Sequence, residues 1–307
     1  MEERFLGEII REKRLEQGLS LEELSEGICD VSTLSRLETG KQSPTRHKLN
    51  RLLQKLGISD DRYFAYVNKE EIELNSLFKD ITALNILYEN MGRDPKIREE
   101  LVCKQEELIS IMDEDDNVAK QFLAISQMVT SEESIEDKIQ NLISVIKLTQ
   151  PKFDEKQIRK GLFSFDEVKL INMLANLYSG LGNHEKAIDI LEQLLRNIDD
   201  RFELIIPSVS NKTLILCNLA RELLIVEDNK RAQEYAEEGK KLAIKYSAYL
   251  KLPGYLMILA ECEHRNGNDD KCKELLKETY YLCKIIGDDA NRKIIEDGFM
   301  EYYGVKI

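Results

Sequence analysis

Apolar residues recur with a helical period along almost the whole chain. Between Phe5 and Leu15 the apolar residues are Phe5, Leu6, Ile9, Ile10 and Leu15, which form a helical stripe. Glycine and proline are scarce, at 15 and 5 of 307 residues, and no segment shows the strict alternation of a half-buried strand. The pattern therefore predicts an all-α fold.

The first 65 residues divide into short helices separated by turn signals. The first helix is predicted to end at Gly18, and SLEE (Ser20 to Glu23) is a capping box that opens the second. A third is predicted from Val31, with Val31, Leu34 and Leu37 buried, and it stops at Gly40. A fourth and a fifth are predicted to begin at SPT (43–45) and SDDRYF (59–64).

Charge is distributed unevenly over the chain. The net charge is −13, yet residues 1–67 hold eleven basic and twelve acidic residues, and residues 68–307 hold 33 and 45. Between Val31 and Lys55 there are six basic residues against one acid, Glu38. Because an acidic body repels DNA phosphates, we expect any contact with double-stranded DNA to be confined to this near-neutral N-terminal part.

The N-terminal motifs resemble a known DNA-binding family. The stretch LGEIIREKRLEQGLSLEELSEGI, followed by STLSRLETGKQSP, is similar to the XRE/Cro-type helix-turn-helix. The resemblance implies a DNA-binding head over residues 1–67, with a recognition helix from Val31 to Thr39. Two departures stand out: Leu21 follows the capping serine where the family often has glutamine, and Cys29 replaces the usual glycine in a turn that looks one residue short.

Side chains on and after the recognition helix are the predicted DNA contacts. Ser32, Thr33 and Arg36 share one helical face, and Arg36 is suited to a bidentate contact with guanine. Residues just beyond the helix are suited to phosphates; these are Lys41, Gln42, Thr45, His47 and Lys48. The alternative interpretation is that Arg36 merely pairs with Glu38 or Glu22 on a solvated surface.

Residues 68–307 repeat a helix–turn–helix theme. SGLGNHEKAIDILEQLL (179–195) resembles a tetratricopeptide repeat, with Ala187 as the small residue packed where two helices cross. Weaker copies place Ala232 and Cys272 in the same role, 45 and 40 residues further on. Earlier pairs are predicted near 69–113 and 117–148, and a capping helix over 288–303. We therefore expect the head to be followed by a right-handed tetratricopeptide-like helical solenoid.

The first helix of each pair should line the concave face of such a solenoid. Two asparagines one turn apart, Asn172 and Asn176, could clamp an extended peptide backbone, and Arg221 could pair with a carboxylate. The predicted peptide contacts are Gln127, Lys169, Asn172, Asn176, Leu214, Cys217, Arg221, Leu224 and Met257. The alternative interpretation is that these residues are solvated surface groups.

An XRE-type head joined to degenerate repeats resembles the peptide-pheromone regulators of Gram-positive bacteria (the Rgg, PlcR, NprR and PrgX group). The resemblance implies a homodimeric transcription regulator controlled by a short signalling peptide. Terminal-helix residues Phe299, Tyr302 and Tyr303, and a linker helix over 72–87, are candidate dimer surfaces. A scaffold or inhibitor whose groove binds a partner protein is the alternative.

Other classes of chemistry find little support in the sequence. Its six cysteines lack a metal-ligand spacing, and no nucleophile–base pair or phosphate loop appears. We therefore expect no enzyme activity, no metal and no cofactor. No long apolar run or signal-peptide pattern is present, so we expect a cytoplasmic protein without a membrane partner.

Overall fold

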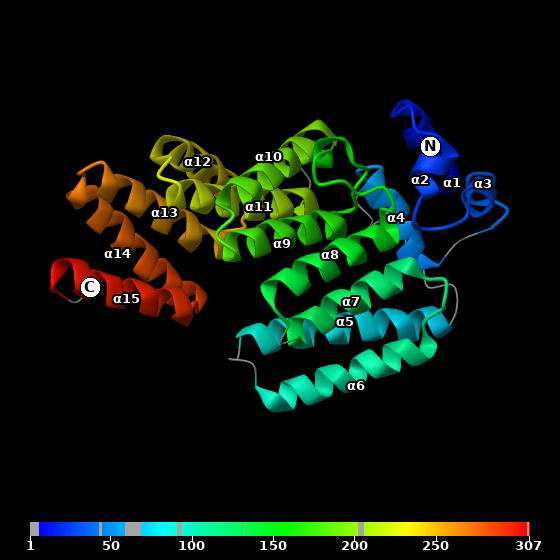
Figure 1. Cartoon of the computed structure of the whole chain (residues 1–307), viewed down its shortest axis with the longest axis horizontal. Helices are drawn as coiled ribbons and strands as arrows, with labels where there is room; N and C mark the ends of the chain where they lie inside the picture. The colour runs from blue at the N-terminus through cyan, green and yellow to red at the C-terminus, as the bar shows by residue number, and fades with distance from the viewer. Residues whose placement is uncertain are drawn as a thin grey trace. The chain divides into compact units, whose positions relative to one another are not determined.

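The computed structural model describes residues 6–42, 45–58, 69–90, 94–131, 133–201, 206–305 and 307. Its regular elements within these ranges are α-helices and two 3-10 turns (Figure 1). Residues Met1–Leu170 form one compact unit and Ile171–Ile307 a second. The predicted all-α class is confirmed.

The first unit contains the head helices and the first repeat-like pairs. Its elements are α1 (Leu6–Glu16), α2 (Leu21–Ser25), α3 (Val31–Glu38), α4 (Arg46–Lys55), α5 (Lys69–Asn90), α6 (Pro95–Ile111), α7 (Asn117–Thr130), α8 (Ile135–Thr149), η1 (Ile158–Lys160) and the start of α9 (Phe165–Gly180). The predicted helix at SDDRYF and the predicted boundary between residues 67 and 68 fall outside the described residues.

Capping hydrogen bonds and glycines with a left-handed backbone mark the ends of the head helices. Ser20 Oγ accepts from the Glu23 amide at 3.1 Å, and Glu23 accepts from the Ser20 amide at 2.7 Å, so the predicted capping box is confirmed. Gly18 has a φ of +67° at the turn after α1. In the shortened turn before α3, Gly27 takes φ +75°, which removes the need for glycine at Cys29.

Helices α1 to α4 enclose an apolar core, which includes Ile10, Leu24, Leu34 and Leu52. Val31 is exposed, so its predicted burial is wrong. Val118 of α7 belongs to the same core. The head is therefore packed against the helices that follow it.

The second unit is a succession of helices that pack on their neighbours. After the remainder of α9 it contains α10 (His184–Arg201), α11 (Ile206–Ile225), α12 (Asn229–Lys245), η2 (Tyr249–Lys251), α13 (Leu252–Arg265), α14 (Asp269–Ile286) and α15 (Asp289–Tyr303). The predicted packing residues Ala187, Ala232 and Cys272 are buried. Each lies in the second helix of a pair, as a tetratricopeptide-like repeat requires. Among the described residues, no helix is long and apolar enough to cross a membrane.

Candidate functional site

Helix α3 presents the predicted base-reading side chains at the surface. Ser32 and Arg36 are exposed and Thr33 is half-buried. Arg36 Nη1 donates to Gln42 Oε1 at a long 3.4 Å, which leaves the guanidinium available to another acceptor. The alternative pairing of Arg36 with Glu38 is not formed, because the Glu38 carboxylate is buried and occupied by Arg14.

Arg14 and Glu38 hold α3 against α1. Arg14 Nε donates to Glu38 Oε1 at 2.7 Å and Nη2 to Oε2 at 2.8 Å, a bidentate pair with both side chains under 10% exposed. Arg14 Nη1 also donates to the Leu19 carbonyl at 2.8 Å. The two motifs that carried the family resemblance therefore meet in one buried ion pair, which fixes the direction in which α3 exposes Arg36.

The start of α4 and the preceding loop form a second part of the exposed edge. Lys41, Gln42 and Thr45 are exposed, and Lys48 is half-buried. Thr33, Gln42, Thr45 and Lys48 all line one open, polar hollow of about 650 Å³. Asp115 and Asn117 line the same hollow, so the loop before α7 adds a negative charge beside Lys48.

His47 is placed away from this edge. It is buried, and its Nε2 pairs with Asp116, the residue that caps α7. Burial raises the pKa of Asp116, but the hydrogen bond and charge of His47 outweigh it and leave this pKa below its usual range. His47 therefore joins α4 to α7, and it does not reach a phosphate on the exposed edge in this conformation.

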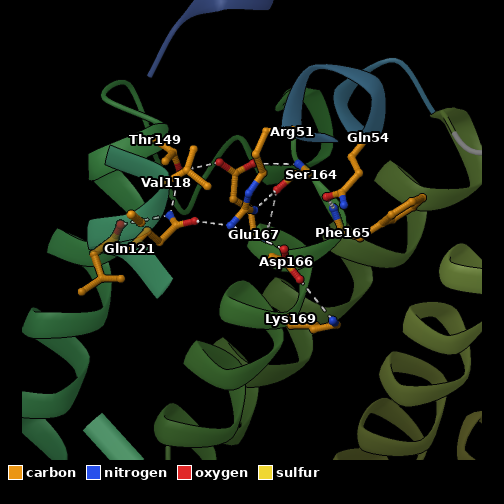
Figure 2. Close-up of polar contacts among 12 residues, drawn as sticks. Arg51, Gln54, Val118, Gln121, Thr149, Ser164, Phe165, Asp166, Glu167 and Lys169 are labelled. Carbon is orange, nitrogen blue, oxygen red and sulfur yellow. Dashed lines mark hydrogen bonds and ion pairs between the residues drawn. The ribbon is translucent and has the colours of Figure 1, made fainter. Parts of the chain in front are cut away.

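The basic segment of the head is only partly a surface feature. Arg51 and Lys55 are also buried, and Lys55 Nζ donates to the Glu26 carbonyl at 2.8 Å. Figure 2 shows Arg51 directed at α7 and α9, where it donates to Ser164 Oγ at 2.5 Å and to Gln121 Oε1 at 3.2 Å. These two cations act as internal anchors, so of the predicted cationic DNA contacts Arg36 and Lys41 are exposed and Lys48 is half-buried.

The junction around Arg51 also contains the cap of α9. Ser164 and Glu167 form a capping box, with the Ser164 amide donating to Glu167 Oε2 at 2.7 Å. Thr149 Oγ1 donates to Glu167 Oε1 at 2.5 Å, and Gln121 Nε2 donates to Thr149 Oγ1 at 2.6 Å. One buried polar network thus ties α4 to α7, α8 and the first turn of α9 (Figure 2).

The predicted groove residues of the second unit are cross-linked by hydrogen bonds. Asn218 Nδ2 donates to Asn172 Oδ1 at 3.0 Å, and Arg221 Nη2 donates to Asn176 Oδ1 at 3.3 Å. Asn172 is buried, whereas Asn176 is half-buried and Arg221 exposed. Each asparagine keeps an Nδ2 group that has no partner among the described residues, so each could donate one hydrogen bond to a ligand.

The remaining predicted groove residues differ in exposure. Leu214, Cys217 and Met257 are half-buried, and Leu224 is buried. Burial raises the pKa of the Cys217 thiol, so this side chain remains neutral and acts as an apolar wall. Gln127 and Lys169 are exposed and belong to the first unit.

Sequence reasoning missed Asn218 and Glu222 on α11. Glu222 is buried and accepts from Ser179 Oγ at 2.8 Å, and His184 Nδ1 lies 2.9 Å from its other oxygen. Asn176 and Arg221 are 45 residues apart, like Ala187 and Ala232, but Asn218 and Glu222 bond to residues 46 and 43 positions away. The repeat spacing therefore indicated the neighbourhood of these two residues and not their exact positions. Equivalent positions of successive repeats meet, and polar side chains at such positions pair with each other.

Within the described ranges, no group of three or more His, Cys, Asp or Glu side chains could hold a metal ion. The six cysteines, all described, are free thiols. The site therefore consists of an exposed polar and basic edge on the head, and a polar ladder between α9 and α11.

Comparisons with known proteins agree with this architecture. Residues 10–62 match the helix-turn-helix family model, and no curated protein matches the chain. Among solved structures, the chain is similar to Bacillus thuringiensis PlcR in complex with the peptide PapR7 and DNA, at 18% identity and a TM-score of 0.60, over 94% of this chain and 98% of that one. It is also similar to the apo competence regulator ComR from Streptococcus vestibularis, at 18% identity and a TM-score of 0.51, over 96% and 97%. The shared fold is a helix-turn-helix head followed by helical repeats.

Proposed function

We propose that the protein is a sequence-specific, DNA-binding transcription regulator whose repeat region is controlled by a short peptide. The exposed Arg36 on α3 carries the proposal, because the buried Arg14–Glu38 pair orients the helix and leaves Arg36 free to read a base. The functional division is a head of residues 1–67 and a repeat region of residues 68–307. The likeness to PlcR, which was solved with a peptide and DNA, supports both halves of the proposal.

Two groups of head residues would contact DNA, one the bases and the other the phosphates. Ser32, Thr33 and Arg36 face the bases, while Lys41, Gln42, Thr45 and Lys48 face the phosphates. A single small head reads one half-site, so a homodimer on a two-fold operator in the cytoplasm completes the proposal.

Arg36→Ala should lower affinity for the operator by ~1–3 kcal/mol and relax base preference at one position. Lys48→Ala should instead weaken binding to every sequence and reduce the salt slope by about one. Genomic footprinting would supply the operator, and fluorescence anisotropy over a salt series would measure both effects. Arg11→Ala, on the exposed face of α1, is the control. Full operator affinity and selectivity in Arg36→Ala would show that α3 is not the reading helix.

The peptide half of the proposal is supported by the ladder between α9 and α11. An extended peptide has unpaired carbonyls, and the Nδ2 groups of Asn172 and Asn176 can donate to them. Leu214, Cys217, Leu224 and Met257 would contact peptide side chains, Arg221 a carboxylate, and Gln127 and Lys169 complete the proposed set.

Asn176→Ala should reduce peptide affinity by ~1–3 kcal/mol, because it removes one hydrogen-bond donor to the peptide and the Oδ1 acceptor that holds Arg221 in position. Mass spectrometry of the protein purified from its own host would identify co-purifying peptides for calorimetry. Asn141→Ala, an exposed asparagine of α8, is the matched control. Unchanged affinity in both Asn172→Ala and Asn176→Ala would place the peptide elsewhere.

The proposed homodimer needs an apolar surface, and exposed residues of α14 support one there. Phe299 is buried, so its predicted exposure is wrong; Tyr303 is half-buried, and the Tyr302 side chain lies outside those described. Tyr281 and Ile285, one turn apart on α14, are 56% and 81% exposed. Ile285→Lys should shift the dimer towards monomer in sedimentation velocity, whereas Leu15→Lys, exposed on the head, should not. A wild-type protein that stays monomeric with and without DNA would contradict the dimer.

A further inference from the structure

A pocket of about 250 Å³ lies among α13, α14 and α15 in the second unit. Its walls are mostly apolar and include Met257, Leu276, Ile295 and Phe299. An engineered apolar cavity of about 150 Å³ in another protein stays dry and binds benzene. The pocket therefore has room for one ring or branched alkyl group with a short chain.

The pocket next to Gly298 is left open although the packing of α15 does not require it. Gly298 lies inside α15, where glycine weakens a helix relative to alanine, and it lines the pocket. A Cβ added to Gly298 would meet no atom within 4 Å. The Cβ of an alanine would fit there without a clash, so glycine leaves open a space that a side chain could enter.

The carboxylate of Glu261 favours a positive charge at the pocket, which is also lined by His264, whose Nδ1 lies 2.8 Å from Asp269 Oδ1. Glu261 lines the pocket, with Oε1 accepting from Arg265 Nε at 2.7 Å and Oε2 without a partner among the described residues. Tyr303 and Cys272 also line the pocket, and Tyr303 Oη donates to Cys272 Sγ at 3.3 Å. Burial raises the pKa of Cys272 and of Tyr303, and the negative charges of Asp269 and Glu261 raise both further. Lys273, which lies 4.7 Å from the Tyr303 ring centre, does not line the pocket.

We propose that this pocket binds an aryl or branched alkyl group that carries an ammonium group, with the ammonium at Glu261 Oε2. The ligand is either a free amine or the N-terminal residue of a peptide, since both combine an apolar group with a nearby ammonium. The site needs neither DNA nor the ladder between α9 and α11, so it goes beyond the function proposed above. Met257 is the residue that it shares with the proposed groove.

Two probes of equal size and opposite charge test the proposal on the full chain. 2-Phenylethylamine should produce saturable shifts in the methyl NMR signals of Met257 and Ile295, and phenylacetate should bind at least about tenfold more weakly. Binding of neither probe would remove the site. Equal binding of both would overturn the assignment of a cationic ligand.

Two substitutions of Gly298 distinguish loss of binding caused by a filled pocket from loss caused by unfolding. Gly298→Ala should raise the melting temperature and keep amine binding, whereas Gly298→Leu should abolish binding because its side chain occupies the space. Glu261→Gln should remove the preference for the amine over phenylacetate. Undiminished binding in a folded Gly298→Leu protein, or an unchanged preference in Glu261→Gln, would overturn the proposal.

A peptide pair identifies the source of the ligand. A tetrapeptide that begins with phenylalanine should bind with a free N-terminus if peptides are the source, and fail to bind if the ligand is a small amine. The N-acetylated form should not bind in either case. Equal binding of the acetylated form would contradict the role of the ammonium.

Discussion

Replacing Arg14 by alanine should destabilise the head by ~3–5 kcal/mol. The change removes two hydrogen bonds from Glu38 and leaves this carboxylate buried without its partner. Removal of one member of a buried ion pair is costly for this reason, even where the intact pair contributes little net stability. Hydrogen exchange of the amides of α1 and α3 in the full chain would measure the loss as a reduced opening free energy.

The adjacent residue provides the matched control. Lys13 pairs with Glu16 at 2.8 Å, but these side chains are 46% and 53% exposed, so Lys13→Ala should change the same quantity by about 0–1 kcal/mol. The double variant Arg14→Ala with Glu38→Ala should lose less than the sum of the single variants, because neither charge is then left alone. Equal exchange rates in Arg14→Ala and Lys13→Ala would contradict the structural role of the pair.

Helical periodicity predicted the elements of the chain well. The predicted pair near 117–148 matches α7 and α8, and the predicted capping helix over 288–303 matches α15. The capping box at the start of α2 was also predicted correctly, because it depends on residues only three positions apart. The helix-turn-helix was recognised because its motifs encode local contacts together with the single Arg14–Glu38 pair.

Burial of charged residues could not be predicted from a charge run. Arg51, Lys55 and His47 belong to the same basic segment as Lys48, but their partners lie far away in the sequence. Ser164 is 113 residues from Arg51, Asp116 is 69 from His47, and Glu26 is 29 from Lys55. A single sequence does not reveal which distant polar groups meet, so His47 was predicted as a phosphate contact together with Lys48.

The groove posed a related difficulty. Counting along the repeats placed Asn176 and Arg221 at equivalent positions, and this geometry was sound enough for them to form a hydrogen bond. The same geometry allows such residues to form hydrogen bonds with each other. Counting positions cannot distinguish these residues from residues whose hydrogen-bonding groups are available to a ligand. The peptide contacts therefore remain predictions, with calorimetry as the test described above.

A second large effect is expected at Gly27, in the turn between α2 and α3. Gly27 and Gly18 both have positive φ, of +75° and +67°, so alanine at either position should cost ~1–2 kcal/mol for the left-handed backbone. A Cβ on Gly18 would meet nothing within 4 Å, but one on Gly27 would lie 2.0 Å from the Thr149 carbonyl oxygen. We therefore expect Gly27→Ala to cost a further ~1–3 kcal/mol, as overpacking does.

The location of the loss distinguishes the two variants. Thr149 lies at the end of α8 and bonds to Gln121 and Glu167 in the network around Arg51, so displacing it should disturb the attachment of α4 as well as the turn itself. Gly18→Ala should accelerate hydrogen exchange in the head alone, whereas Gly27→Ala should also accelerate it at the end of α8 and in the first turn of α9. If both variants raise the hydrogen-exchange rates of the same amides by the same amount, the contact between the head and α8 does not hold the head in place.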